Sequence, residues 1–92
     1  MRLYSHRLWG SSGENSRMTP KAAAKIAEKQ EKEIIKRLRE ARLAKGLTYE
    51  ALAEITGIHR TTISMIERSK IHPTMLVCLK LAVVLGLDLT ND

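Results

Sequence analysis

The sequence predicts an all-α fold of four main helices, in which the first helix is long because it is extended at its amino end. Two observations predict this class. The composition combines 43% apolar and 28% charged residues with no Phe, and it is rich in strong helix formers. Residues 21–45 contain no helix breaker, and beyond them Gly46, Gly57 and Pro73 separate three short segments with helical apolar periodicity.

The length of 92 residues predicts one small domain with terminal segments, because so short a chain cannot build two separate cores. The single cysteine, Cys78, cannot form an internal disulfide and falls on the apolar pattern of a helix. No apolar run approaches the ~20 residues that cross a bilayer, and the amino terminus lacks the apolar block of a signal peptide. We therefore expect a cytoplasmic protein without a membrane partner.

The net charge of +6 suits an acidic partner such as nucleic acid, but its distribution is uneven. Residues 18–45 hold nine basic and four acidic side chains, whereas residues 46–92 hold four basic and five acidic ones. Basicity alone is therefore a poor argument that residues 46–92 bind DNA.

Residues 1–18 are expected to form a flexible amino-terminal arm, since Tyr4 and Trp9 stand in a glycine-containing stretch without sustained periodicity. One interpretation is a disordered terminus, or an upstream start that precedes a true beginning at Met18. The others are an apolar strand that pairs with a second subunit, or a basic arm that lies along DNA and carries Arg2, Arg7 and Arg17.

The first helix begins at Thr19, the expected N-cap, with Pro20 in the first helical position, and it ends at Gly46. Residues 19–33 form a helical extension whose apolar residues are mostly Ala, with Ile26 the one larger side chain. This extension is either a solvated helix or a helix that binds a partner. Core packing, and with it the domain over residues 34–92, begins at Ile34 and Ile35, followed by Leu38 and Ala41.

Residues 48–68 predict a helix-turn-helix. Thr48 caps a second helix over residues 49–56, Gly57 forms the tight turn, and a third helix begins near His59 or Arg60 and ends at about Arg68. We expect the second helix to turn Leu52 and Ile55 inward, and the third helix to bury Ile63 and Ile66. The outer face of the third helix is then a mainly polar stripe of Arg60, Thr61, Ser64, Met65 and Arg68. Any surface helix can carry such a stripe, but this frame sets a recognition helix into the major groove.

Thr74 is expected to cap a fourth helix that ends at Leu85 and is closed by Gly86. Its predicted inner stripe is Met75, Cys78, Leu79, Ala82 and Leu85. The opposite side is also apolar, with Leu76, Val77, Leu81, Val83, Val84 and a single polar residue, Lys80. The first helix, the tail that follows Gly86 or a second subunit must cover it. We favour a homodimer contact made by Leu76, Val83, Val84, Leu87 and Leu89.

Arg42, Gly46, the run LAEITGIHRTTISMIE, Pro73 and the ending AVVLGL together resemble the lambda-repressor-like, Cro-type helix-turn-helix domain. The resemblance covers residues 35–89, about 55 of the 92 residues. Residues 57–68 are also similar to controller proteins of restriction–modification systems and to small phage repressors.

The resemblance implies a five-helix domain that binds operator DNA as a homodimer with its third helix in the major groove. It implies base contacts by Arg60, Thr61, Ser64 and Met65, whose donors, acceptors and apolar groups suit base edges. It implies phosphate contacts by Thr48, Tyr49, Lys70, His72 and Thr74. It also implies a structural ion pair between Arg42 and Glu67.

Three features depart from the pattern of that family. His59 stands where a Ser or Thr usually caps the third helix. Ser69 replaces the usual glycine after that helix, which lowers the stability of the fold by about 1 kcal/mol if Ser69 keeps the left-handed conformation. Only six residues follow Gly86, too few for a full fifth helix. Because a full fifth helix is not expected, we expect the long first helix and the fourth helix to provide the dimer contact.

The sequence thus predicts a sequence-specific transcriptional regulator that binds double-stranded DNA. The main alternative is an antitoxin-like module whose amino-terminal helix holds a small protein and which can also bind its own promoter. A domain of this fold that no longer reads DNA is a further alternative, and a basic membrane-binding helix is a weaker one. His6, His59 and His72 are scattered and no metal-ligand spacing appears, so we expect no enzyme, no metal and no cofactor.

Overall fold

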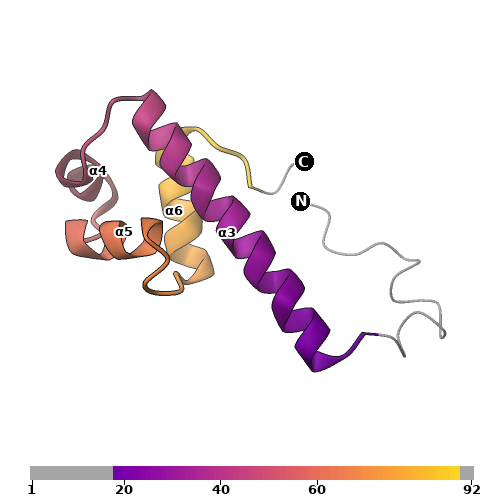
Figure 1. Cartoon of the computed structure of the whole chain (residues 1–92). Helices are drawn as coiled ribbons and strands as arrows, with labels where there is room; N and C mark the ends of the chain where they lie inside the picture. The colour runs from indigo at the N-terminus through magenta and orange to yellow at the C-terminus, as the bar shows by residue number, and fades with distance from the viewer. Residues whose placement is uncertain (1–17, 90–92) are drawn as a thin grey trace.

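A computed structural model of the protein describes residues 18–89, which contain four α-helices and no β-strand. The helices are α3 (Pro20–Ala44), α4 (Tyr49–Thr56), α5 (Arg60–Glu67) and α6 (Met75–Leu85). Figure 1 shows α4, α5 and α6 gathered beside one half of α3, while the amino half of α3 projects past them. The all-α class and the four main helices are confirmed, whereas most of the expected arm lies outside the described residues.

The ends of α3 are set by local chemistry. Thr19 Oγ1 accepts a hydrogen bond from the N–H of Ala22 at 3.0 Å, and Pro20 occupies the first helical position. At the other end Gly46 has a φ of 68°, and the next residue, Leu47, donates its N–H to the carbonyl of Arg42 at 3.1 Å. This is the glycine-closed helix end that the sequence predicts.

The turn between α4 and α5 also follows the prediction. Thr48 Oγ1 accepts from the N–H of Ala51 at 3.0 Å, and Gly57 adopts a φ of 77°. His59 then caps α5, because its ring Nδ1 accepts the N–H of Thr61 at 3.1 Å. An imidazole nitrogen thus performs the task of the usual hydroxyl, and it can do so only while it carries no proton.

The carboxyl end of α5 keeps the left-handed conformation although no glycine is present. Ser69 has a φ of 56°, and the N–H of Lys70 reaches the carbonyl of Met65 at 2.8 Å. The loop therefore retains the glycine-type helix end and bears the strain of a side chain there.

One core holds the four helices together. It lies at the carboxyl half of α3, as expected from the position of Ile34 and Ile35, and leaves Ile26 exposed. The buried apolar residues are Ile35, Leu38, Leu52, Ile63, Ile66, Leu81, Ala82 and Leu85.

Two predictions about inward-facing residues were wrong. Ile55 of α4 is 58% exposed, and Leu52 is the residue of this short helix that is buried in the core. In α6 the expected inner residues Met75 and Leu79 are exposed, whereas Leu81, expected on the outer side, is 3% exposed. Because α6 is apolar on nearly every side, its sequence pattern contains no polar face that could fix its rotation.

The rotation of α6 leaves an apolar face on the surface of the described part of the chain. Cys78 is half-buried. The exposed side chains of the face are Met75, Leu76, Leu79 and Val83, and Ile55 of α4 lines the same shallow groove as the last three.

Candidate nucleic-acid interface

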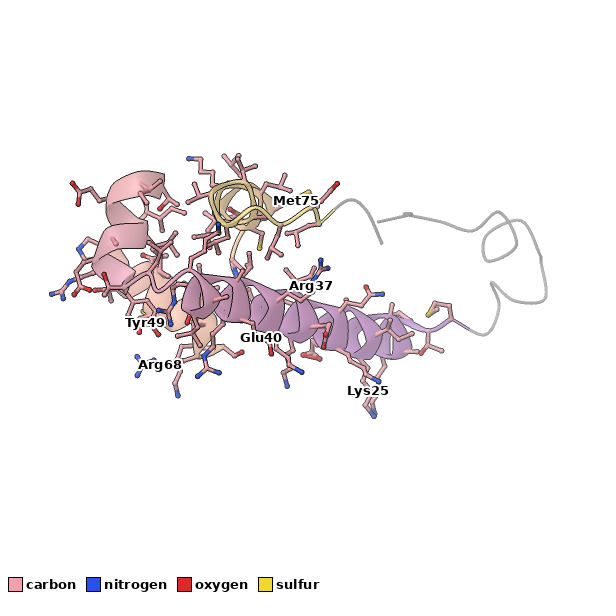
Figure 2. The ribbon with its side chains drawn as sticks, turned by 90° about the horizontal axis from the view of Figure 1, so that it is seen from above. Lys25, Arg37, Glu40, Tyr49, Arg68 and Met75 are labelled. Carbon is pink, nitrogen blue, oxygen red and sulfur yellow. The ribbon has the colours of Figure 1, made fainter. Side chains whose placement is uncertain are left out.

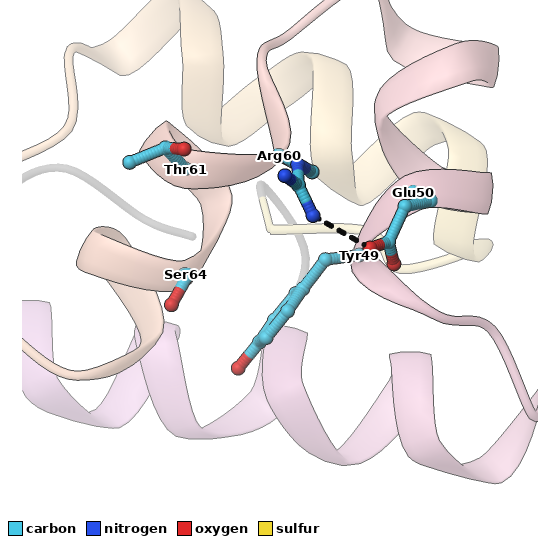
Figure 3. A pocket seen from close by; sticks show the side chains of 5 residues that line it. All are labelled: Tyr49, Glu50, Arg60, Thr61 and Ser64. Atoms are coloured by element: carbon cyan, nitrogen blue, oxygen red, sulfur yellow. Dashed lines mark hydrogen bonds and ion pairs between the residues drawn. The ribbon is translucent and has the colours of Figure 1, made fainter.

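The outer face of α5 and the first residues of α4 form one shallow depression. Ile63 and Ile66 anchor the inner face of α5 at 1% exposure each, and this fixes which side of the helix faces outward. Figure 3 shows the depression, with Ser64 and Tyr49 beside each other and Thr61 pointing away from Tyr49. Its lining residues are Tyr49, Glu50, Arg60, Thr61 and Ser64, while Met65 lies half-buried outside it.

Arg60 is held by an exposed carboxylate. Its Nη1 lies 3.0 Å from Glu50 Oε2, and the two side chains are 61% and 64% exposed. A hydrogen bond to its own backbone N–H, and then the bond from Arg60, hold the pKa of Glu50 below its ordinary value. An ion pair this exposed contributes little to stability, so Arg60 can exchange it for another acceptor at small cost.

A second ion pair lies beneath the depression and is nearly buried. Arg42 Nε and Nη2 donate to the two carboxylate oxygens of Glu67 at 2.7 and 2.9 Å, as the family resemblance implies. Arg42 Nη1 donates to the Leu47 carbonyl at 2.7 Å, and the guanidinium lies 4.4 Å from the centroid of the Tyr49 ring. Tyr49 also donates its hydroxyl to Glu67 at 3.3 Å. The pair therefore joins α3, the start of α4 and the end of α5, and it positions Tyr49 beside the outer face of α5.

The residues expected to contact phosphate fall into two groups. Thr48 and Tyr49 lie at the amino end of α4, next to the outer face of α5. Lys70, His72 and Thr74 lie in and after the loop that follows α5, with Thr74 Oγ1 capping α6 through the N–H of Val77 at 3.2 Å.

His72 is tied to α3, because its Nδ1 lies 2.8 Å from Glu31 Oε1. Sequence reasoning missed this contact and also the pairing of Glu50 with Arg60. Their partners stand 41 and 10 residues apart, so no helical spacing could have indicated either contact.

A family model described as helix-turn-helix matches residues 38–90, which is more than half of the chain. The chain belongs to the Cro/CI-type helix-turn-helix family. No curated protein and no solved structure matches it significantly.

Membership of this family confirms the lambda-repressor-like resemblance and identifies the protein as a DNA-binding regulator in general terms. The Cro/CI-type family is not typically enzymatic. Among residues 18–89, no helix has the length and apolar character needed to cross a membrane. The matched region begins within α3, so residues 20–37 of that helix precede it.

Proposed function

We propose that the protein is a sequence-specific regulator that binds double-stranded DNA as a homodimer with α5 in the major groove. The observation that carries the proposal is the outer face of α5. It presents a guanidinium and two hydroxyls beside the amino end of α4, on a helix whose inner face is fixed by Ile63 and Ile66. A helix placed in this way can enter the groove while the start of the preceding helix meets the backbone.

Each side chain on the outer face suits one kind of contact. Arg60 can bond O6 and N7 of guanine bidentately once it leaves Glu50, and Thr61 and Ser64 can donate to or accept from base edges. Met65 can pack on a thymine methyl.

Phosphate contacts come from both ends of this surface. Thr48 and Tyr49 meet the DNA backbone at the start of α4, where the amino end of the helix favours anions. Lys70, His72 and Thr74 meet it beyond the end of α5.

The test is selection of bound sequences from random duplex DNA, carried out with the unaltered protein and with Arg60→Ala. The variant should bind more weakly by about 1 to 3 kcal/mol and lose its preference at one operator position, because a bidentate base contact is lost. Arg37→Ala is the control, since Arg37 is exposed on α3 outside the depression. If Arg60→Ala keeps both affinity and preference, α5 is not the reading helix.

The homodimer contact is proposed on the apolar face of α6. Leu76 and Val83 are 62% and 77% exposed, and two such side chains on one face favour a covering partner. Val84, Leu87 and Leu89 are half-buried against the core, so they contribute from the edge of this face.

Leu76→Glu and Val83→Glu should each give monomers by sedimentation or light scattering, because a buried unpaired charge is costly. Ile26→Glu, at a similarly exposed position on the amino half of α3, tests whether the long first helix contributes to the contact as well. A dimer that persists in both α6 variants would place the interface elsewhere.

An antitoxin-like role remains the alternative, and the projecting amino half of α3 favours it. In that case the protein should co-purify with a small partner encoded beside it, and deletion of residues 20–30 should release that partner. A homodimer that binds DNA unaided would count against this role.

A further inference from the structure

Six basic side chains lie along one side of α3. At 100° per residue they fall within a sector of about 80°, and at 1.5 Å per residue they extend over about 27 Å. All six are exposed. The nearest acidic side chains, Glu28 and Glu40, lie about 20° beyond the two edges of the sector. The basic stripe consists of Lys21, Lys25, Lys29, Lys32, Lys36 and Arg39.

The buried core does not include this stripe. The side of α3 that packs carries Ile35, Leu38 and Arg42, which are buried, and the contact from Glu31 to His72 lies on that side too. Pairs of like charge four residues apart, such as Lys21 with Lys25, weaken an isolated helix. Opposite charges four residues away, Glu28 for Lys32 and Glu40 for Lys36, offset part of this cost. Lys32 lines a small pocket with Ser69 and His72 of the loop after α5. The exposed cations of the stripe therefore remain available to a polyanionic partner.

The direction of the stripe can be compared with the end of α5, the proposed reading helix. Figure 2 shows Lys25 projecting to the same side of the molecule as Arg68, at the end of α5, while Arg37 and Met75 lie on the opposite side. The stripe therefore faces away from the apolar face of α6 and extends the side on which α5 ends.

The distribution of charge along the chain also favours a polyanionic partner. Residues 46–92, which contain α4, α5 and α6, hold four basic and five acidic side chains. Most of the affinity of a protein for DNA comes from cations that displace counterions from phosphates, and this part of the chain has no excess of cations. The stripe offers six.

The composition of the stripe favours a nucleic-acid backbone over an acidic protein. Five of its six members are Lys, a point charge that suits phosphates without fixing a geometry. Protein interfaces are depleted in Lys and rely on large apolar or aromatic anchors. The sector holds only Met18 and Leu43, at its two ends, as apolar side chains.

We propose that the basic stripe of α3 binds the phosphate backbone of double-stranded DNA beside the base pairs that α5 reads. This proposal rests on the proposed function and adds a second contact region to it. A length of about 27 Å corresponds to about eight base-pair steps along the duplex axis, at 3.4 Å per step, and a straight helix can contact those phosphates of this stretch that face it. The contact adds affinity without adding sequence preference.

The test compares the triple variant Lys21→Gln, Lys25→Gln and Lys29→Gln with the full unaltered chain. Gln keeps a high helix propensity, and far-ultraviolet circular dichroism checks that α3 remains helical. The control variant carries Arg37→Gln and Lys45→Gln, which remove two charges at exposed positions off the stripe and outside the apolar groove of α6. Binding to a selected operator duplex is measured over a range of salt concentrations.

The stripe variant should lower the slope of log K against log salt by about 2 to 3, since each lost phosphate contact contributes about 0.9. The control should change the slope by less than about 1. The base preference of both variants should match that of the unaltered chain. On a duplex trimmed to the base pairs read by α5, the difference between the stripe variant and the unaltered chain should disappear.

Equal slopes for the stripe and control variants would overturn the proposal and leave α5 as the DNA-binding surface. An acidic protein would then be the partner to seek. Failure of the unaltered chain to select any DNA would instead refute the proposed function and this proposal with it. If the triple variant loses helix content, Lys32→Gln with Lys36→Gln repeats the test in the half of α3 that packs on the core.

Discussion

Removal of one partner of the Arg42–Glu67 pair should destabilise the whole domain. The two side chains are 10% and 6% exposed, and they form two direct hydrogen bonds. Glu67→Leu leaves the guanidinium of Arg42 buried, with the Leu47 carbonyl as its acceptor and the Tyr49 ring beside it. It also removes the acceptor of the Tyr49 hydroxyl. The single substitution therefore affects three helices at once.

The expected loss is about 3 to 5 kcal/mol of unfolding free energy, the usual cost of an uncompensated buried charge. A 92-residue chain has a total stability of about 5 to 14 kcal/mol, so the loss is a large part of it. In a domain of this size the melting temperature should fall by at least about 12 °C. Arg42→Met should cost a similar amount, including about 1 kcal/mol for the Leu47 carbonyl that loses its donor.

The double variant Arg42→Met with Glu67→Leu should recover most of this stability, since an apolar pair of similar volume avoids the desolvation of two charges. Urea denaturation of the unaltered protein, the two single variants and the double variant completes a double-mutant cycle. If the unfolding free energy of all four proteins has the same dependence on urea concentration, the midpoints report the changes in stability. Glu50→Gln is the exposed counterpart in the same molecule and should leave the midpoint almost unchanged. The reasoning fails if each single variant loses less than about 1 kcal/mol, or if the double variant loses the sum of both.

Three further perturbations test local features of the fold. Ser69→Gly should raise the unfolding free energy by about 1 kcal/mol, because glycine adopts the φ of 56° without strain, and a lower urea midpoint would contradict this. His59→Ala should cost about 1 kcal/mol by removal of the α5 cap, and His59→Asn should restore the melting temperature. Burial, and then the nearby charge of Glu31, raise the pKa of the Cys78 thiol. The thiol should therefore react with iodoacetamide more slowly in the folded than in the urea-unfolded protein, and stability should fall as pH rises past the ordinary thiol pKa.

The sequence predicts the helix boundaries well because short-range chemistry determines them. Thr19 and Thr48 accept N–H groups three residues ahead, and Gly46 and Gly57 adopt the left-handed conformation that glycine permits. Such signals lie within a few residues of the atoms that they contact, so no knowledge of the packing is needed.

The sequence does not predict the rotation of α6 or the two long-range contacts. In α6, Lys80 is the single polar side chain, and Met75 and Leu81 could exchange places without violating any apolar pattern. The contacts of Glu50 with Arg60 and of Glu31 with His72 join different elements, so they depend on how the helices pack. The sequence therefore predicts only some of the residues that line the depression, and Glu50 is not among those it predicts.

The two ion pairs that reach α5 differ in burial, and this difference separates the support of the helix from its reading surface. Glu67 is nearly enclosed, so its pair with Arg42 cannot open without leaving a charge away from water. Arg60 is mostly exposed, so water or a base edge can replace Glu50 at small cost. In the proposed function, Glu50 keeps the guanidinium at the mouth of the depression until DNA offers a better acceptor. Binding then requires one exposed side chain to exchange its partner, while α5 keeps its position.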